Sequence, residues 1–280
     1  MNFKTLSTIA CAAGLMALAS CSDSNKQSTA IANDGHLLWF NSLQMEAPAE
    51  FGTKTLQIAE QNIEKYWKSS QKVDLSLNST ANNALGNEGF ELTFADAKIT
   101  ASANTEIGLL YASYHLLRRQ ECGQLPASGS VQSVPAYERR VLNHWDNLDG
   151  TIERGFAGHS LWDWAEINPN APESNSNIYA EYARANASVG INGTVLNNVN
   201  AKPEALTTES LQKAKVIADQ LRPYGIRVYL SINFASPIKV GGLKTADPLD
   251  ANVVSWWKDK VNEIYQIGRA SCRERVFYKV

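Results

Sequence analysis

The stretch RRVLNHWDNLDGTIERGFAGHSLWDW, residues 139–164, decides how the chain is interpreted. It begins as a strand, because Val141, Leu142 and Trp145 favour a pleated backbone. It then becomes polar and rich in Gly, and α/β folds hold their ligands where a buried parallel strand ends in such a loop. The stretch therefore predicts either a ligand site at a strand end or, equally well, a Trp-rich core corner with a turn at 149–150.

Strand and helix patterns alternate around and after this stretch. Strands are expected at 139–145, 193–198 and 226–234, and helices at 177–188, 208–221 and 250–266. Each strand ends in polar residues, which places the loops at one face of a parallel sheet. We therefore expect residues 138–266 to form about three βα units, the first part of an incomplete (β/α)8 TIM barrel, which needs about 250 residues when complete.

Residues 34–122 predict a small α/β N-terminal domain before the barrel. Strands are expected at 37–40, 73–77, 90–94 and 98–103, and helices at 55–67 and 105–119. Thr105 stands where it can cap the second helix. His115 has apolar neighbours, so a core or interface position fits it better than ligand binding. Residues 123–137 contain Ser, Gly and Pro and are expected to link the two domains.

The N-terminal segment predicts export. Residues 1–20 have a basic start and an apolar core too short to span a bilayer, as a signal peptide does. The sequence LASC at 18–21 matches a bacterial lipobox, which would make Cys21 a lipidated residue that anchors the protein to a bacterial membrane, in the periplasm or at the cell surface. An ordinary cleaved signal that ends in Cys is the alternative. Residues 21–33 are small and polar, like a flexible tether.

The composition argues against several classes of function. The chain has 280 residues, of which 44% are hydrophobic and 19% charged, with a formal net charge of −2. This charge gives no basic surface for nucleic acid. Cys11 and Cys21 lie in the export signal and Cys272 in an atypical tail, which leaves Cys122 alone in the folded body. Neither a disulfide framework nor a zinc cluster is therefore expected, and no cofactor or metal is implied.

A series of motifs in order resembles one known family. The motifs are LNHWDNLDG at 142–150, IERGFAG at 152–158, GINGTVLNNVNA at 190–201, LRPYGIRVYLSINFASP at 221–237 and GGLKTADPLD at 241–250. Together they resemble the α-glucuronidases of glycoside hydrolase family 67, over roughly residues 34–266. The resemblance implies removal of α-1,2-linked glucuronic acid, or its 4-O-methyl ether, from glucuronoxylan-derived oligosaccharides with inversion. A homodimer of the longer protein is one expectation, and the oligomeric state stays open.

The resemblance assigns part of a sugar pocket to this chain. Trp145 would be a wall against which a sugar ring stacks, and the hydroxyl partners would be Asp146, Asn147, Asn198 and Asn200. A glycosidase also needs two carboxyl groups that flank the scissile bond. In the family the general acid follows the fourth barrel strand and the base carboxylates lie on later strands. No residue of this chain is therefore expected to be catalytic.

If the chain were complete, four carboxylates would be the candidates for acid and base: Asp146, Asp149, Glu153 and Glu166. Asp146 fits hydroxyl binding better than acid chemistry, and Asp149 fits a turn. Glu153 fits a structural ion pair with Arg154.

The C-terminal residues 267–280, IGRASCRERVFYKV, do not continue the pattern. They are basic, and the first ten resemble the translation of a sequencing adapter. We expect this tail, from Ile267, to be non-native and the gene to continue. A complete, small protein of three α/β units is the alternative.

Two functions of different classes remain. The first is an exported, lipid-anchored α-glucuronidase of xylan degradation, of which the 280-residue chain would be an inactive fragment. The second is a surface glycan-binding lipoprotein without catalysis. A hexosaminidase-type barrel shares the architecture but explains LNHWDNLDG less well. A Glu after a fourth strand, with further carboxylates at later strand ends, would distinguish the enzyme from the binding protein.

Overall fold

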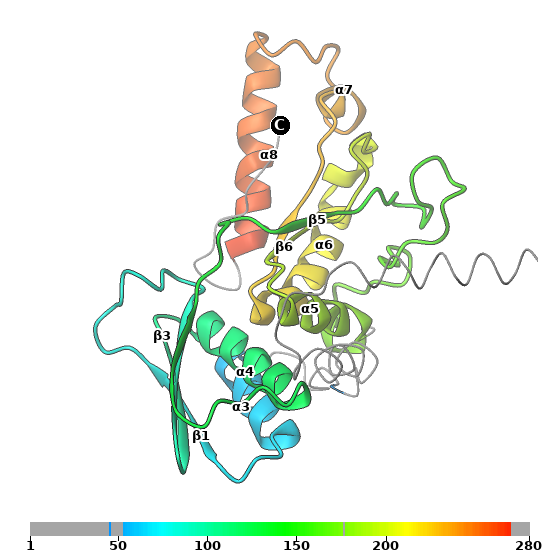
Figure 1. Ribbon diagram of the computed structural model, residues 1–280. Coiled ribbons are helices and arrows are strands. Elements are labelled where there is room, and N and C mark those ends of the chain that lie inside the picture. The colour runs from blue at the N-terminus through cyan, green and yellow to red at the C-terminus, as the bar shows by residue number, and fades with distance from the viewer. Residues whose placement is uncertain (1–44, 46–52, 176, 270–280) are drawn as a thin grey trace, which may run out of the picture.

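The computed structural model describes residues 45, 53–175 and 177–269. These residues form two α/β units, each with a sheet and helices packed on it (Figure 1). The predicted signal peptide, Cys21, the predicted tether and the strand expected at 37–40 lie outside the described residues, as do residues 270–280. Within the described ranges, no helix has both the length and the apolar character needed to cross a membrane.

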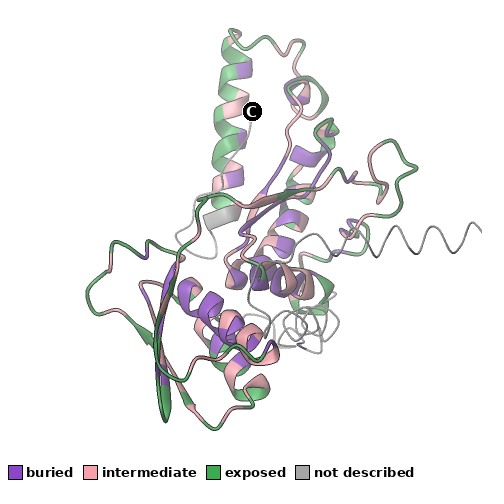
Figure 2. Ribbon diagram, viewed as in Figure 1, coloured by how far each residue is buried: buried purple, intermediate pink, exposed green. Residues whose placement is uncertain are grey.

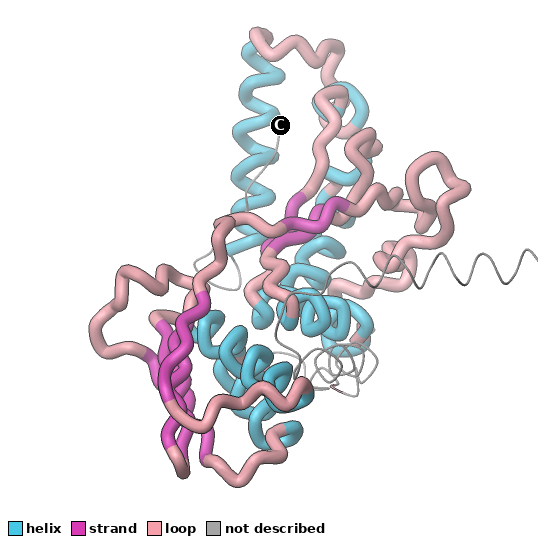
Figure 3. Tube along the Cα trace, viewed as in Figure 1, coloured by secondary structure: helices cyan, strands magenta, loops and turns pink. Residues whose placement is uncertain are grey.

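The first unit contains a four-stranded mixed sheet in the order β1-β3-β2-β4. Its strands are β1 (Lys72–Leu77), β2 (Phe90–Ala95), β3 (Lys98–Ala103) and β4 (Gly129–Ser133). β1 is parallel to β3, and the other neighbouring strands are antiparallel. Helices α3 (Thr55–Tyr66) and α4 (Glu106–Glu121) cover one face (Figure 3). Alternate residues of β2 and β3 are buried, as a sheet with one covered face requires.

The elements predicted for this unit are confirmed within the described residues, with one correction. The Thr105 hydroxyl accepts a hydrogen bond of 3.3 Å from the backbone N–H of Gly108, so it caps α4 as expected. The correction is β4, which lies inside the segment 123–137 expected as a linker. β4 is short and polar at the sheet edge, and pairing with β2 rather than an apolar pattern holds it in place.

The second unit contains three parallel strands in the order β5-β6-β7. They are β5 (Val141–Asn143), β6 (Gly193–Val195) and β7 (Arg227–Tyr229). The α-helices are α5 (Ile178–Ser188), α6 (Thr208–Leu221), the short α7 (Ser236–Lys239) and α8 (Ala251–Arg269). Three 3-10 helices lie at Pro172–Ser174, Pro203–Leu206 and Arg222–Tyr224. The predicted order of the three strands and three long helices is confirmed, although α7 and the 3-10 helices were not predicted, the strands are shorter than expected and α8 continues through Ile267.

The two faces of the parallel sheet differ in what packs against them. One face packs on the helices, where the Tyr182 hydroxyl of α5 lies 2.9 Å from the Thr194 hydroxyl of β6. On the other face, a Cβ on Gly193 would lie only 2.9 Å from side-chain atoms of Tyr229 and Val141. Glycine therefore lets the side chains of β5 and β7 approach over β6. Figure 2 shows the mixture of buried, intermediate and exposed residues along these strands.

A partly buried polar cluster joins the two units. The Arg140 guanidinium, just before β5, forms an ion pair with Glu88 and donates to the carbonyl of Gly190. The Asn192 side-chain N–H groups donate to the Glu88 carboxylate at 3.0 and 3.1 Å and to the Glu138 carbonyl at 2.7 Å. The Arg140 and Glu88 side chains are each only 18% exposed. The cluster therefore fixes the loop before β2 to the starts of β5 and β6.

We predict that Arg140→Met destabilises the protein by about 2–3 kcal/mol, because it leaves the Glu88 carboxylate buried without its cation. Urea unfolding measures the change. Lys98→Met is the matched control, since Lys98 pairs with Asp74 at the surface and such pairs contribute about 0–1 kcal/mol. Equal small effects of the two substitutions would contradict a structural role for the cluster.

We also predict that His115 makes stability depend on pH. Burial, together with the positive charges of Arg119 and Arg118, lowers the pKa of His115 to about 4. Arg119 also donates to its Nε2 at 2.8 Å. The unfolded state takes up a proton near pH 6.5 while the folded state does not, so stability falls between about pH 6.5 and pH 4. Thermal unfolding across this range should show a smaller fall for His115→Gln. An unchanged pH profile would contradict the prediction.

Candidate functional site

The ends of β5 and β6 lie side by side. The pairing continues past both strands, because the Asn198 backbone N–H donates to the Asp146 carbonyl at 2.6 Å. The loop after β5 then turns back on itself through isolated bridges between Asp146 and Ile152 and between Thr151 and His159. The sequence positions expected at a sugar pocket are therefore close in space, at the carboxyl ends of parallel strands.

The three Trp residues of this region have different environments. Trp145 is 42% exposed, whereas Trp162 and Trp164 are 0% and 5% exposed. The Trp162 ring contacts the rings of His144 and Tyr182 at centroid distances of 5.3 and 5.1 Å. Both alternatives from the sequence are thus partly present: Trp162 and Trp164 form a core corner, and Trp145 offers an indole to solvent at a strand end.

Asp146 is buried, at 3% exposure, and its carboxylate bonds within the protein. Its Oδ2 accepts a hydrogen bond of 2.5 Å from the Ser160 hydroxyl, and that hydroxyl accepts from the Trp162 backbone N–H at 2.9 Å. His144 Nδ1 lies 3.9 Å from Oδ1. Burial lowers the pKa of His144, and the charge of Asp146 opposes that shift. Asp146 therefore fixes the loop to the Trp corner.

The side-chain N–H groups of Asn147 and Asn198 bond within the protein, mainly to backbone carbonyls. Asn147 Nδ2 donates to the Glu153 carbonyl at 2.9 Å and to the Thr151 hydroxyl at 3.0 Å. Asn198 Nδ2 donates to the carbonyls of Trp145 and Glu153 at 3.3 and 3.4 Å. Asn198 Oδ1 accepts from the backbone N–H of Asn200 at 2.9 Å. Asn200 itself is exposed. These amides hold the loop in shape.

Asp149 closes the turn predicted for it. Its Oδ1 accepts from the Thr151 hydroxyl and backbone N–H at 2.6 and 3.1 Å, and its Oδ2 lies 3.2 Å from Lys202 Nζ. These hydrogen bonds, first those from Thr151 and then that from Lys202, lower the pKa of the exposed Asp149 carboxylate to about 2. Lys202 follows β6, so this pair connects the loops after β5 and β6.

The interactions of Glu153 differ from those predicted for it. The structure records no ion pair between Glu153 and the exposed Arg154, so the expected structural pair is wrong. The Glu153 backbone instead interacts with the strand ends: its N–H donates to the Trp145 carbonyl at 2.7 Å, and its carbonyl accepts from the two amides described above. Neighbours in sequence could not reveal this arrangement, because the partners come from two different strands.

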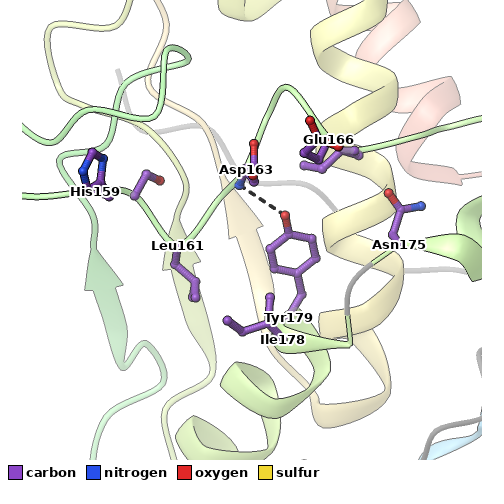
Figure 4. A pocket seen from close by; sticks show the side chains of 9 residues that line it. His159, Leu161, Asp163, Glu166, Asn175, Ile178 and Tyr179 are labelled. Carbon is purple, nitrogen blue, oxygen red and sulfur yellow. Dashed lines mark hydrogen bonds between the residues drawn. The ribbon is translucent and has the colours of Figure 1, made fainter.

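A cavity of about 620 Å³ lies beside these strand ends (Figure 4). It is lined by His159, Ser160, Leu161, Asp163, Glu166, Ile167, Asn175, Ile178 and Tyr179. The Tyr179 hydroxyl accepts from the Asp163 backbone N–H at 3.2 Å. Of the acid–base candidates from the sequence, Glu166 lines this cavity, but none of the five predicted sugar-binding residues does. In the described part of the chain, no group of three or more His, Cys, Asp or Glu could hold a metal ion.

The fold is that of an α/β protein with a parallel sheet, a class in which ligand sites are commonly found at the carboxyl ends of the strands. Residues 120–268 match the family described as the glycosyl hydrolase family 67 middle domain. This match covers more than half of the chain. The chain therefore belongs to glycosyl hydrolase family 67.

Curated relatives agree with this assignment. The chain is 40% identical over 182 residues to probable alpha-glucuronidase A of Aspergillus clavatus, covering 65% of this chain and 21% of the relative. It is 37% identical over 185 residues to alpha-glucuronidase A of Emericella nidulans, covering 64% of this chain and 21% of the relative. The chain thus spans about a fifth of the length of the curated relatives that it matches.

A solved structure is similar in fold. It is described as a GH138 enzyme targeting pectin rhamnogalacturonan II, and the match has a TM-score of 0.51 at 15% identity, covering 77% of this chain and 28% of that one. This similarity extends over both α/β units, since it covers more of the chain than either unit contains.

We predict that Asp146→Asn lowers the free energy of unfolding by about 1–3 kcal/mol, because hydrogen bonds to a charged group are the stronger kind and this one is buried. Chemical denaturation measures the loss. Asp163→Asn, at an exposed carboxylate of the same loop, is the control and should stay within about 0.5 kcal/mol of the unchanged protein. If Asp146→Asn leaves the free energy of unfolding unchanged, the structural role of Asp146 is contradicted, and a role in contacting a ligand alone is favoured.

Proposed function

We propose that this chain is the part of an α-glucuronidase that forms one wall of its sugar pocket. The longer enzyme would remove α-1,2-linked (4-O-methyl)glucuronic acid from glucuronoxylan-derived xylo-oligosaccharides. The observation that carries the proposal is the family 67 match, which spans β5, β6, β7 and the loops after them. The relatives' name, alpha-glucuronidase, supports the bond that would be cleaved.

We further propose that β5, β6 and β7 are the first three strands of a (β/α)8 barrel. Three features support this: the strands are parallel, they pair in sequence order, and a helix follows each one. The face around Gly193 would then point into the barrel, and the loops that carry Trp145 and Asn198 would lie at the face where barrel enzymes hold substrate.

In this proposal the chain binds and orients the sugar, while the acid and base come from the rest of the longer enzyme. Inversion needs two carboxyl groups about 6.5–9.5 Å apart, one to protonate the leaving oxygen and one to activate water. Asp146 is engaged by Ser160, and Asp149 by Thr151 and Lys202. We therefore assign proton transfer to neither of them. Trp145 would stack on the ring, as exposed indoles do.

We propose that the longer enzyme is exported and held at a bacterial membrane by a lipid on Cys21. The motif LASC at 18–21 supports this location. A polymer such as glucuronoxylan does not enter cells readily, so an enzyme anchored outside the cytoplasm would meet its oligosaccharides directly. A homodimer remains a proposal for the longer protein.

The test compares the 280-residue chain with the protein from the complete gene, using aldotriouronic acid as substrate. We predict that the longer protein releases glucuronic acid and that the 280-residue chain does not. Chromatography of the released sugar measures both. A longer protein that binds the oligosaccharide without cleaving it would contradict the enzyme and favour a glycan-binding lipoprotein. Release by the 280-residue chain would contradict the placement of acid and base.

A further inference from the structure

Glu153 has a backbone conformation that most side chains avoid. Its φ is +55°, and it is the single non-glycine residue with positive φ among residues 53–175 and 177–269. In this left-handed region a Cβ approaches the following carbonyl oxygen, so glycine adopts it more readily than glutamate. Such strain persists only where the surroundings determine it, and it gathers at functional sites. A glutamate here points to a role for its side chain.

The surroundings that determine the conformation are the two strand ends. The Glu153 N–H donates to the Trp145 carbonyl at 2.7 Å. The Glu153 carbonyl accepts from Asn147 Nδ2 at 2.9 Å and from Asn198 Nδ2 at 3.4 Å. Both backbone groups of Glu153 are thus held by residues that were expected to contact the sugar themselves: Trp145 by stacking, and Asn147 and Asn198 by hydrogen bonds to hydroxyls.

The Glu153 carboxylate differs from the other carboxylates at these strand ends. Asp146 bonds to Ser160, and Asp149 bonds to Thr151 and Lys202. For the half-buried Glu153 side chain, the described residues provide no hydrogen bond or ion pair. A carboxylate has two oxygens that can accept hydrogen bonds from two neighbouring hydroxyls, and such charged acceptors form the stronger hydrogen bonds.

We propose that the Glu153 carboxylate binds two neighbouring hydroxyls of the sugar ring that packs on Trp145. Asn147 and Asn198 are positioning residues, which act by holding the Glu153 backbone. The inference rests on the proposed function, since it names a contact of that same sugar. Because like charges repel, the uronate carboxylate of the substrate would point away from Glu153.

The first test measures kinetics of the complete enzyme on aldotriouronic acid. Glu153→Gln keeps the shape of the side chain and removes its charge, so kcat/KM should fall about tenfold to a hundredfold, while the thermal midpoint stays unchanged. Glu153→Gly removes the side chain and the strain, so kcat/KM should fall at least as far while the thermal midpoint rises. Glu204→Gln, at an exposed carboxylate after β6, is the matched control and should change neither.

The second test asks whether Asn147 acts through Glu153. Asn147→Ala should lower kcat/KM when Glu153 is present and should cause little further loss in combination with Glu153→Gln. A residue that merely stabilises the loop would lower activity by the same factor in both backgrounds. That result would overturn the positioning role.

The remaining outcomes distinguish failure of this inference from failure of the proposed function. An active enzyme whose Glu153→Gln variant keeps its kcat/KM would overturn the inference and leave the proposed function standing. A Glu153→Gln variant with a lowered midpoint would also overturn it, because the loss would then be structural. A lower thermal midpoint for Glu153→Gly would contradict the claim that the Glu153 backbone is strained. A complete, folded enzyme that releases no glucuronic acid would overturn the proposed function and the inference together.

Discussion

The hydrogen bond from the Asn198 backbone to the Asp146 carbonyl is the contact on which the site depends. It extends the pairing of two parallel strands past the end of the regular ladder, so the two loops leave the sheet together. With Asn198 fixed there, its amide reaches the carbonyls of Trp145 and Glu153. A change of register between β5 and β6 would separate all of these groups, because every side chain would move to the opposite face.

The rest of the chain holds that register. Arg140 and Asn192 stand just before β5 and β6, and both bond to Glu88 from the first unit. The first unit contributes no strand-end group to the site, but its carboxylate fixes where the two strands begin. Gly193 then permits the close approach of neighbouring side chains over β6. Contacts at the amino ends of the strands therefore fix the register, and this register positions the groups of the site at the carboxyl ends.

Much of the fold could be predicted from the sequence, because apolar periodicity is a local signal. Helix α6 has the bounds expected for it, and the order of strands and helices after residue 138 is as predicted. Strand β4 was missed because pairing, rather than an apolar pattern, holds it. The strands of the parallel sheet are shorter than predicted. Past the end of β7, for example, the Ser231 backbone N–H donates to the Asn197 side-chain oxygen at 2.7 Å rather than to a backbone carbonyl.

The site was predicted less completely, for a physical reason. The sequence indicated which residues stand at strand ends, and the exposed indole of Trp145 agrees with that expectation. It could not indicate how Asn147 and Asn198 use their amides, because the carbonyl of Glu153 meets them only after the loop folds back. Positive φ at a residue other than glycine likewise leaves no sequence signal.

The most direct measurement is a crystal structure of the complete enzyme with glucuronic acid bound. The account predicts that the sugar ring lies against the indole of Trp145, with two of its hydroxyls within hydrogen-bond distance of the Glu153 carboxylate. A sugar bound in the cavity beside Tyr179, with solvent alone above Trp145, would contradict it.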